Sequence, residues 1–191
     1  MTKYCKRFAE SSLDNYLCKT EEQKKLIEVL RNGIVNGFDK NIIIIGGVGT
    51  GKTHLAYSII NSLEKVKENP QTSSKWYSEE KVIYKPVKEI IDEIRDEWKT
   101  GVSIMGSFIE RFKKIPLLIV DEIGVQYGSE SERIELYSIF NARYEDCLPT
   151  IVISNNSLTE LQKILGQRIY DRLTGESVIF QLTGKSYRQG E

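Results

Sequence analysis

The sequence predicts an α/β fold in which helices cover both faces of a mainly parallel, five-stranded sheet. Short apolar segments alternate along the chain with segments whose apolar residues recur at helical spacing. The short segments lack polar alternation, which is typical of strands that are buried on both faces. A glycine-rich loop joins the first of these strands directly to a helix. We therefore expect a doubly wound, three-layer sandwich.

The first helix is expected to begin at a capping box, residues 20–23, in which the Thr20 hydroxyl accepts from the Gln23 amide. Its apolar face is formed by Leu26, Ile27, Leu30 and Ile34. Strands are expected at residues 41–45, 82–84, 117–120, 150–154 and 178–182. Further helices are expected after the glycine loop, over 86–98 with Pro86 in the first turn, over 131–146, and as two short helices within 158–173.

The two polar segments of the chain suggest its organisation. Residues 67–81 are polar and are expected to form a surface loop. Residues 1–19 show no strong periodicity, so we divide the chain into an N-terminal lead-in, residues 1–19, and one domain, residues 20–191.

Composition and charge narrow the class of protein. The chain of 191 residues carries 27 basic and 27 acidic side chains, so it lacks the basic excess of a protein that holds duplex DNA by phosphate contacts alone. Its three widely spaced cysteines, without partner histidines, argue against a disulfide framework or a zinc site. The longest wholly apolar run, residues 42–45, is far too short for a membrane span. We expect a soluble, cytoplasmic protein that makes no membrane contact.

A phosphate-binding loop occupies residues 46–53. Its pattern Gly-x-x-x-x-Gly-Lys-Thr places backbone amides around phosphates at a helix N-terminus, where the helix dipole favours negative charge. Lys52 is expected to reach the β- and γ-phosphates of ATP, and the Thr53 hydroxyl to ligate Mg²⁺. The residues assigned to nucleotide binding here are Gly46, Gly47, Val48, Gly49, Thr50, Gly51, Lys52, Thr53 and His54. His54 is the only histidine and has no obvious partner, which favours a structural role for it.

Two acidic residues close the third expected strand. Ligands of α/β sheets gather at this edge, so Asp121 is expected to hold the metal through water, and Glu122 to polarise the attacking water as general base. The pair favours hydrolysis of ATP over phosphoryl transfer to a small acceptor. Asn155 follows the fourth strand, and its amide could orient the water or contact the γ-phosphate if that strand lies between the first and the third. A turn-forming asparagine is the alternative.

Two basic regions carry further hypotheses. Arg168 and Arg172 lie four residues apart on one helix face, where a guanidinium could neutralise transition-state charge in a neighbouring subunit. A solvated basic face is the alternative. Trp98 could stack a single-stranded base or be a packed tryptophan on a solvated helix. The cations expected near it are Arg95, Lys99, Arg111, Lys113 and Lys114.

Five segments together resemble the bacterial replicative-helicase loader ATPases of the DnaC/IstB type, a branch of the AAA+ superfamily. They are residues 46–55 (GGVGTGKTHL), 117–124 (LLIVDEIG), 150–155 (TIVISN), 166–173 (GQRIYDRL) and 184–188 (GKSYR). The resemblance covers most of residues 20–188, which makes residues 20–191 an AAA+ ATPase domain. The first two segments are common to many P-loop NTPases, and the last three, in this order, point to the family.

The resemblance implies roles for particular residues. Asn155 matches the sensor-1 asparagine, Arg172 the trans-acting arginine finger and Arg188 the sensor-2 arginine, which contacts the nucleotide. Arg168 matches a second arginine of the same motif. The family binds single-stranded DNA around its second helix and after the acidic pair, where Trp98 and Ser129 fall. The loader branch has no C-terminal helical lid, and we expect none here.

The implied function is that of a Mg²⁺-dependent ATPase that loads a replicative DNA helicase in DNA replication. Such a protein binds the helicase and single-stranded DNA, and forms a homo-oligomer on DNA and ATP. Alternatives are an ATPase of the same branch that regulates transposition or initiates replication, a P-loop kinase, and a nucleotide-switched binding module. Family members usually carry an N-terminal partner-binding region, whereas only about 20–40 residues precede the first strand here. The chain is then either an isolated ATPase domain or a short variant.

Overall fold

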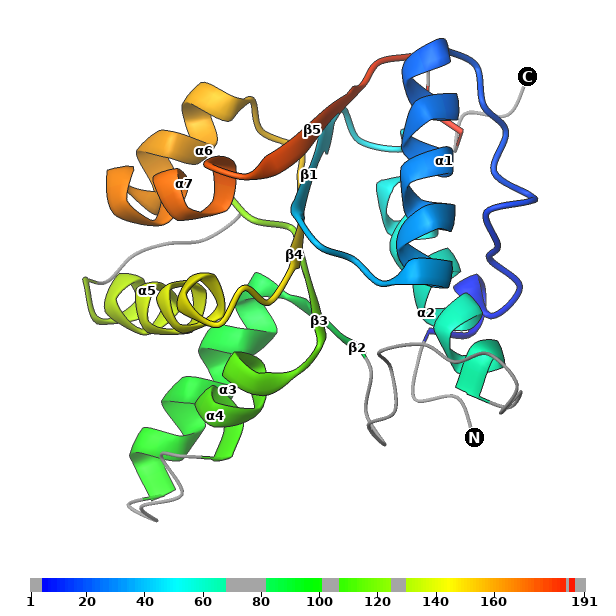
Figure 1. Ribbon diagram of the computed structural model, residues 1–191. Coiled ribbons are helices and arrows are strands. Elements are labelled where there is room, and N and C mark those ends of the chain that lie inside the picture. The colour runs from blue at the N-terminus through cyan, green and yellow to red at the C-terminus, as the bar shows by residue number, and fades with distance from the viewer. Residues whose placement is uncertain (1–4, 68–81, 101–106, 125–129, 185, 188–191) are drawn as a thin grey trace.

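The central sheet confirms the predicted fold. A computed structural model describes residues 5–67, 82–100, 107–124, 130–184 and 186–187. The strands of its sheet lie in the order β2-β3-β4-β1-β5, and every pairing is parallel (Figure 1). They are β1 (Asn41–Gly46), β2 (Val82–Pro86), β3 (Leu117–Asp121), β4 (Thr150–Ser154) and β5 (Ser177–Leu182). The sheet, expected to be mainly parallel, is parallel throughout, and β4 lies between β1 and β3.

Helices cover both faces of the sheet and form a three-layer sandwich (Figure 1). On one face lie α1 (Glu21–Asn36) and α2 (Lys52–Lys67). On the other lie α3 (Val87–Thr100), α4 (Ser107–Lys114), α5 (Glu130–Glu145), α6 (Leu158–Leu165) and α7 (Gln167–Thr174). Alternate residues of β1 divide between the two cores, because successive side chains of a strand point to opposite faces. Ile42 and Ile44 pack with the first group of helices, and Ile43 and Ile45 with the second.

Local sequence signals account for most element boundaries. The capping box at the start of α1 is confirmed, because the Gln23 amide donates to the Thr20 hydroxyl at 3.2 Å and the Gln23 side chain accepts from the Thr20 amide at 3.1 Å. The four apolar residues expected on the inner face of α1 are all buried. A second capping box, formed by Ser157 and Glu160, starts α6. These caps supply partners for amides that a helix leaves unbonded at its N-terminus.

Three details differ from the sequence prediction or lie beyond it. Pro86 pairs with Asp121 as the last residue of β2, and α3 begins one residue later, at Val87. The helix α4 has no counterpart among the predicted elements, because eight residues give only two turns of apolar periodicity. The loop expected at 67–81 lies outside the described residues except for Lys67, which ends α2.

The N-terminal segment, residues 5–20, packs along α2. The Asn61 side chain of α2 donates to the carbonyls of Phe8 at 3.2 Å and Ser11 at 2.8 Å. Leu13 and Tyr16 are buried in the core that α1 and α2 share. The segment is thus joined to the main body by hydrogen bonds and apolar contacts, and the division of the chain after residue 19 stays a prediction.

A buried arginine ties together the amino-terminal ends of two strands. Arg143 of α5 is 1% exposed, and its Nε donates to the Thr150 hydroxyl at 2.9 Å. Its two terminal nitrogens donate to the carbonyls of Phe112, Ile115 and Pro149 at 2.6–2.8 Å. Burial lowers the pKa of Arg143 to about 9, whereas the four acceptors favour its protonated form. This side chain therefore fixes α5 against the segments that lead into β3 and β4.

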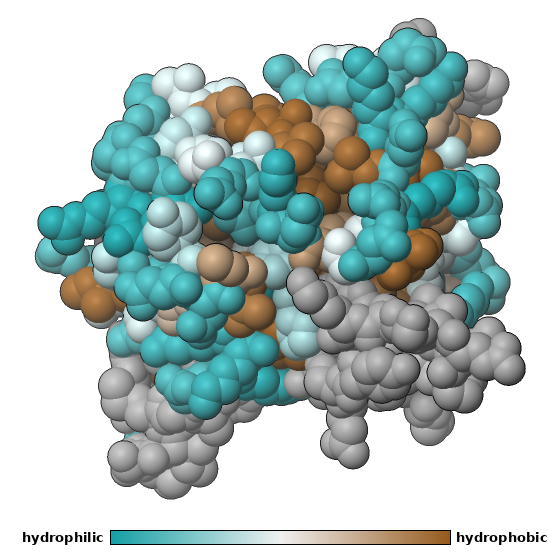
Figure 2. Space-filling model, viewed as in Figure 1, coloured by the Kyte–Doolittle hydropathy of each residue, from teal (hydrophilic) through white to brown (hydrophobic). Residues whose placement is uncertain are grey.

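Within the described ranges, no helix has both the length and the apolar character needed to cross a bilayer. The face in Figure 2 is largely hydrophilic, with apolar patches near β5. Ile179 of β5 and Val35 of α1 are among the exposed apolar residues. All three cysteines are free thiols.

Candidate nucleotide-binding site

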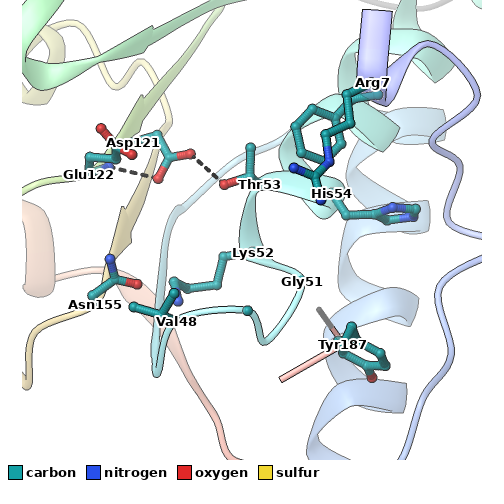
Figure 3. Close-up of a pocket in the computed structure, with 12 residues that line it drawn as sticks. Arg7, Val48, Gly51, Lys52, Thr53, His54, Asp121, Glu122, Asn155 and Tyr187 are labelled. Carbon is teal, nitrogen blue, oxygen red and sulfur yellow. Dashed lines mark hydrogen bonds between the residues drawn. The ribbon is translucent and has the colours of Figure 1, made fainter. Parts of the chain in front are cut away.

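A cavity of about 290 Å³ lies at the carboxyl ends of β1, β3 and β4 (Figure 3). Ligands of open α/β sheets bind at this edge, where loops from successive strands meet. The residues that line the cavity are Arg7, Phe8, Val48, Gly49, Gly51, Lys52, Thr53, His54, Asp121, Glu122, Asn155 and Tyr187. The structure thus brings together the glycine loop, the acidic pair and the asparagine that the sequence singled out.

The lysine of the glycine loop is held inside the loop itself. Lys52 is 6% exposed, and its ammonium donates to the carbonyls of Gly46 and Gly47, both at 2.7 Å. It also contacts the Thr50 hydroxyl at 3.3 Å. The loop therefore places the cation at its centre, where the backbone curls around it, and leads at once into α2.

Two glycines allow neighbouring segments to approach the loop closely. Gly49 and Gly51 have φ angles of 81° and 87°, a region that side chains with a Cβ rarely adopt. A Cβ at Gly51 would lie 2.6 Å from the Tyr16 ring, whose hydroxyl donates to the Thr50 carbonyl at 3.0 Å. On the other side, the Tyr187 amide donates to the Gly49 carbonyl at 2.9 Å. The N-terminal and C-terminal segments therefore both brace the loop.

The two residues expected to hold the metal are in contact. The Thr53 hydroxyl donates to Asp121 Oδ2 at 3.1 Å, and the Glu122 amide donates to Asp121 Oδ1 at 2.7 Å (Figure 3). Asp121 is 3% exposed. Mg²⁺ prefers oxygen ligands and is usually held by one or two protein groups together with phosphates and waters. A hydroxyl beside a carboxylate fits that preference. The described ranges hold no group of three or more His, Cys, Asp or Glu that could bind a metal ion on its own.

A tyrosine from the neighbouring strand supplies a further donor to the same carboxylate. The Tyr84 hydroxyl of β2 donates to Asp121 Oδ2 at 2.9 Å. Burial, followed by the negative charge of Asp121, raises the pKa of Tyr84 above its ordinary value. Tyr84 is therefore a protonated donor at neutral pH, and the carboxylate accepts three hydrogen bonds in all.

Glu122 and Asn155 face the cavity from adjacent strands. Both side chains are exposed to solvent, and Figure 3 shows them on the same side of the cavity as Lys52. The backbone of Glu122 has a φ angle of 58°, which is uncommon for a residue with a Cβ and is concentrated at functional sites. β4 lies between β1 and β3, which is the strand order on which the expected role of Asn155 depends. Its contact with water or the γ-phosphate stays a prediction.

His54 has two partners in the N-terminal segment. Its Nε2 lies 3.2 Å from the Ser12 carbonyl, and its Nδ1 lies 3.3 Å from the Ser11 hydroxyl. A carbonyl can only accept, so Nε2 carries the proton in this arrangement. These contacts join α2 to the segment before α1, and His54 also lines the nucleotide cavity, so its structural role stays a prediction.

Arg172 lies away from the cavity of its own chain. Its Nε donates to the Asn141 side chain at 2.6 Å, and its guanidinium lies 4.9 Å from the ring centre of Tyr137 and 5.7 Å from that of Tyr144. It lines a second cavity of about 320 Å³. A residue that acts on a neighbouring subunit must lie outside its own site, so this position is compatible with the expected role.

The structure leaves several predicted residues without a described side chain. Arg188 and Ser129 lie outside the described residues, and Trp98 belongs to α3 without a described side chain. Conversely, sequence reasoning did not find Arg7, Phe8 or Tyr84. The segment that contains Arg7 and Phe8 has no periodicity or motif that could have indicated them. Tyr187, by contrast, lies within the quoted segment 184–188.

Fold and site together define an ATP-binding P-loop protein with an AAA+ fold. Residues 3–191 match the profile of the IstB-like ATP-binding proteins, and the chain belongs to this family. The replicative helicase loader DnaC of Escherichia coli K12 is 31% identical over 189 residues, which cover 92% of this chain and 72% of that protein. The ATP-binding protein named for insertion sequence IS5376 of Geobacillus stearothermophilus is 28% identical over 175 residues, or 89% of this chain and 63% of that protein.

A comparison of structures supports the same fold. The crystal structure of the DnaC helicase loader superposes with a TM-score of 0.77 at 21% sequence identity. The match covers 94% of this chain and 100% of that chain. At this level of identity the likeness establishes the arrangement of helices and strands, and the function has to be inferred from the site.

Proposed function

We propose that this chain hydrolyses ATP, assembles into a homo-oligomer on single-stranded DNA, and helps to load a replicative DNA helicase. The observation that carries the proposal is the meeting of Lys52, the Thr53–Asp121 pair, Glu122 and Asn155 around one cavity. The similarity to a helicase loader over 92% of the chain supports the choice of biological role. A cytoplasmic location is part of the same proposal.

In the proposed reaction the chain binds and orients the triphosphate. The Lys52 ammonium exchanges its loop carbonyls for β- and γ-phosphate oxygens, and loop amides donate to the remaining phosphate oxygens. Thr53 and Asp121 would hold Mg²⁺, directly and through water. When bound, Mg²⁺ neutralises charge on the β- and γ-phosphates.

The acidic pair and the asparagine would then act on water. Glu122 is exposed to the cavity and accepts the proton of the attacking water, while Asn155 orients that water against the γ-phosphate. Asp121 is less suited than Glu122 to act as base, because its carboxylate is buried and already accepts three hydrogen bonds. This division of tasks between neighbouring carboxylates favours hydrolysis over transfer to a bound acceptor.

Arg172 is proposed to complete the site of a neighbouring copy. A guanidinium presents a planar fork that matches phosphate oxygens and stays charged at all relevant pH values. Its place outside the nucleotide cavity explains why assembly would be needed for full turnover. Arg168 and Arg188 are proposed as further basic contributors.

Regulation of transposition is the second candidate, because a relative named for an insertion sequence is 28% identical over 89% of the chain. The two functions share ATP binding and differ in the protein partner. A hexameric replicative helicase and a transposase are therefore the two partners to compare.

The first test measures ATP hydrolysis and oligomeric state with and without single-stranded DNA. We expect DNA to stimulate turnover and to promote assembly when ATP is present. Lys52→Ala should lose ATP binding by about 100-fold or more, since it removes the only loop cation. Unchanged affinity in this variant would refute the phosphate-loop assignment. Pull-down of purified helicase against purified transposase then separates the two candidate roles.

A further inference from the structure

Three aromatic rings connect the N-terminal segment to the carboxylate at the proposed metal site. Phe8 stacks on Tyr57 of α2, with ring centres 4.8 Å apart and planes inclined by 12°. Tyr57 in turn lies against Tyr84 of β2, with ring centres 5.0 Å apart. The Tyr84 hydroxyl then donates to Asp121 Oδ2 at 2.9 Å. This aromatic column, Phe8–Tyr57–Tyr84, therefore ends on Asp121.

The last contact of the column restricts the orientation of the carboxylate. The Glu122 amide bonds Oδ1, whereas Thr53 and Tyr84 both bond Oδ2. Two of these donors belong to segments that line the nucleotide cavity, but Tyr84 comes from the neighbouring strand and does not line it. Without the Tyr84 hydroxyl, Oδ2 would keep only the Thr53 hydroxyl, a group that is itself proposed to bind the metal.

The rings of the column are buried or partly buried. Tyr57 is 7% exposed, and Tyr84 and Phe8 pack as partly buried residues against the core that α1 and α2 share. Packed interiors hold few voids, so a ring cannot shift without moving its neighbour. At the outer end, Phe8 belongs to a short 3-10 helix, η1 (Lys6–Phe8), whose residues are otherwise exposed.

We propose that Tyr84 is a positioning residue for Asp121, and that the aromatic column makes the affinity for Mg²⁺–ATP depend on how the N-terminal segment is docked. The inference rests on the proposed role of Asp121 in holding the metal. Arg7 and Phe8 line the nucleotide cavity directly. Through the column, Phe8 would in addition influence the metal site indirectly. A partner that displaced this segment would thereby weaken metal and nucleotide binding.

The test measures equilibrium binding of a fluorescent, slowly hydrolysed ATP analogue while Mg²⁺ is titrated. Tyr84→Phe removes only the hydroxyl, and we expect the half-saturating Mg²⁺ concentration to rise by about fivefold. Affinity for the analogue in EDTA should stay unchanged, because the phosphate loop is intact. Phe8→Leu, which keeps apolar bulk but not the stacked ring, should raise the same concentration by about twofold.

The double variant tests whether Phe8→Leu changes the Mg²⁺ dependence by way of Tyr84. If the column transmits it, Phe8→Leu should add nothing in the Tyr84→Phe background, because coupled residues are not additive. Tyr170→Phe, on α7 and outside the cavity, is the matched control and should bind like the unmodified chain. Unfolding temperatures without nucleotide check that every variant is folded.

Three results would contradict the inference, and they are distinguishable from one another. If the unmodified chain binds in a Mg²⁺-dependent way and Tyr84→Phe gives the same titration, Tyr84 does not position Asp121 and the proposed function stands. If binding by the unmodified chain ignores Mg²⁺, the metal role of Asp121 fails and the inference fails with it. Full additivity of Phe8→Leu and Tyr84→Phe would refute transmission through the column.

Discussion

The two cavities at opposite ends of the sheet hold their cations in different ways. At the carboxyl ends of the strands, Lys52 is buried and surrounded by the carbonyls of its own loop. At the amino-terminal ends, Arg172 is half-buried and lies on two tyrosine rings. A cation enclosed by its own loop can reach a ligand bound to the same chain, whereas a half-buried cation outside that cavity can contact a neighbouring chain. The contrast is the one expected if Lys52 serves the nucleotide site of its own chain and Arg172, as proposed, serves that of a neighbouring copy.

The largest expected effect tests whether Arg172 acts across an interface. Arg172→Ala should leave ATP binding intact and lower DNA-stimulated turnover by about 10³-fold, because an arginine finger contributes to the transition state and hardly to ground-state binding. Arg172→Lys should recover little, since the charge remains but the planar fork is lost. Steady-state hydrolysis at saturating ATP measures both variants.

Mixing experiments separate action in trans from action in cis. Glu122→Gln keeps Arg172 but lacks the proposed base, so in mixed assemblies it can donate its guanidinium to an intact site of Arg172→Ala. We expect turnover to reappear when the two inactive variants are combined. A mixture that stays inactive, although both variants co-assemble, would remove the support for a trans-acting arginine.

The next expected effect concerns the nucleotide cavity, which Glu122 lines. Glu122→Gln should bind ATP as tightly as the unmodified chain and lose hydrolysis by about 10²-fold or more, because the amide cannot accept the proton of water. Pre-steady-state measurement of phosphate release distinguishes a chemical defect from slow product release. Hydrolysis at an unchanged rate would mean that another group serves as base.

Arg143 is a second arginine of the Arg172 cavity, and we expect its role to be structural rather than catalytic. It lines the same cavity as Arg172 but is buried and donates to four protein acceptors. Arg143→Met should therefore lower the free energy of unfolding by about 2 kcal/mol, because carbonyls are left without partners. Turnover of the folded fraction should change little. Urea denaturation measures the first quantity, and an unchanged midpoint would show that water replaces the guanidinium without cost.

The sequence predicted the parts of the molecule in which one local pattern decides the outcome. The loop around Lys52 and the strand that ends at Asp121 follow from glycine spacing and from unbroken apolar runs, and the structure places them as expected. The N-terminal segment was not predicted, since its contacts to Asn61 and Tyr57 join residues about 50 positions apart in the chain. The Tyr84–Asp121 bond depends likewise on strand order, which no local pattern contains.

The smallest expected effect tests whether Asn155 takes part in the nucleotide site or only forms a turn. Asn155 lines the cavity and is exposed, whereas the neighbouring Asn156 packs beside Gly124 and does not line it. Asn155→Ala should lower turnover by about fivefold, the value of one neutral hydrogen bond of about 1 kcal/mol to water or phosphate. Asn156→Ala is the matched control and should keep its turnover. Equal effects of both substitutions would favour the turn, because a structural role makes no distinction between a side chain inside the cavity and one outside it.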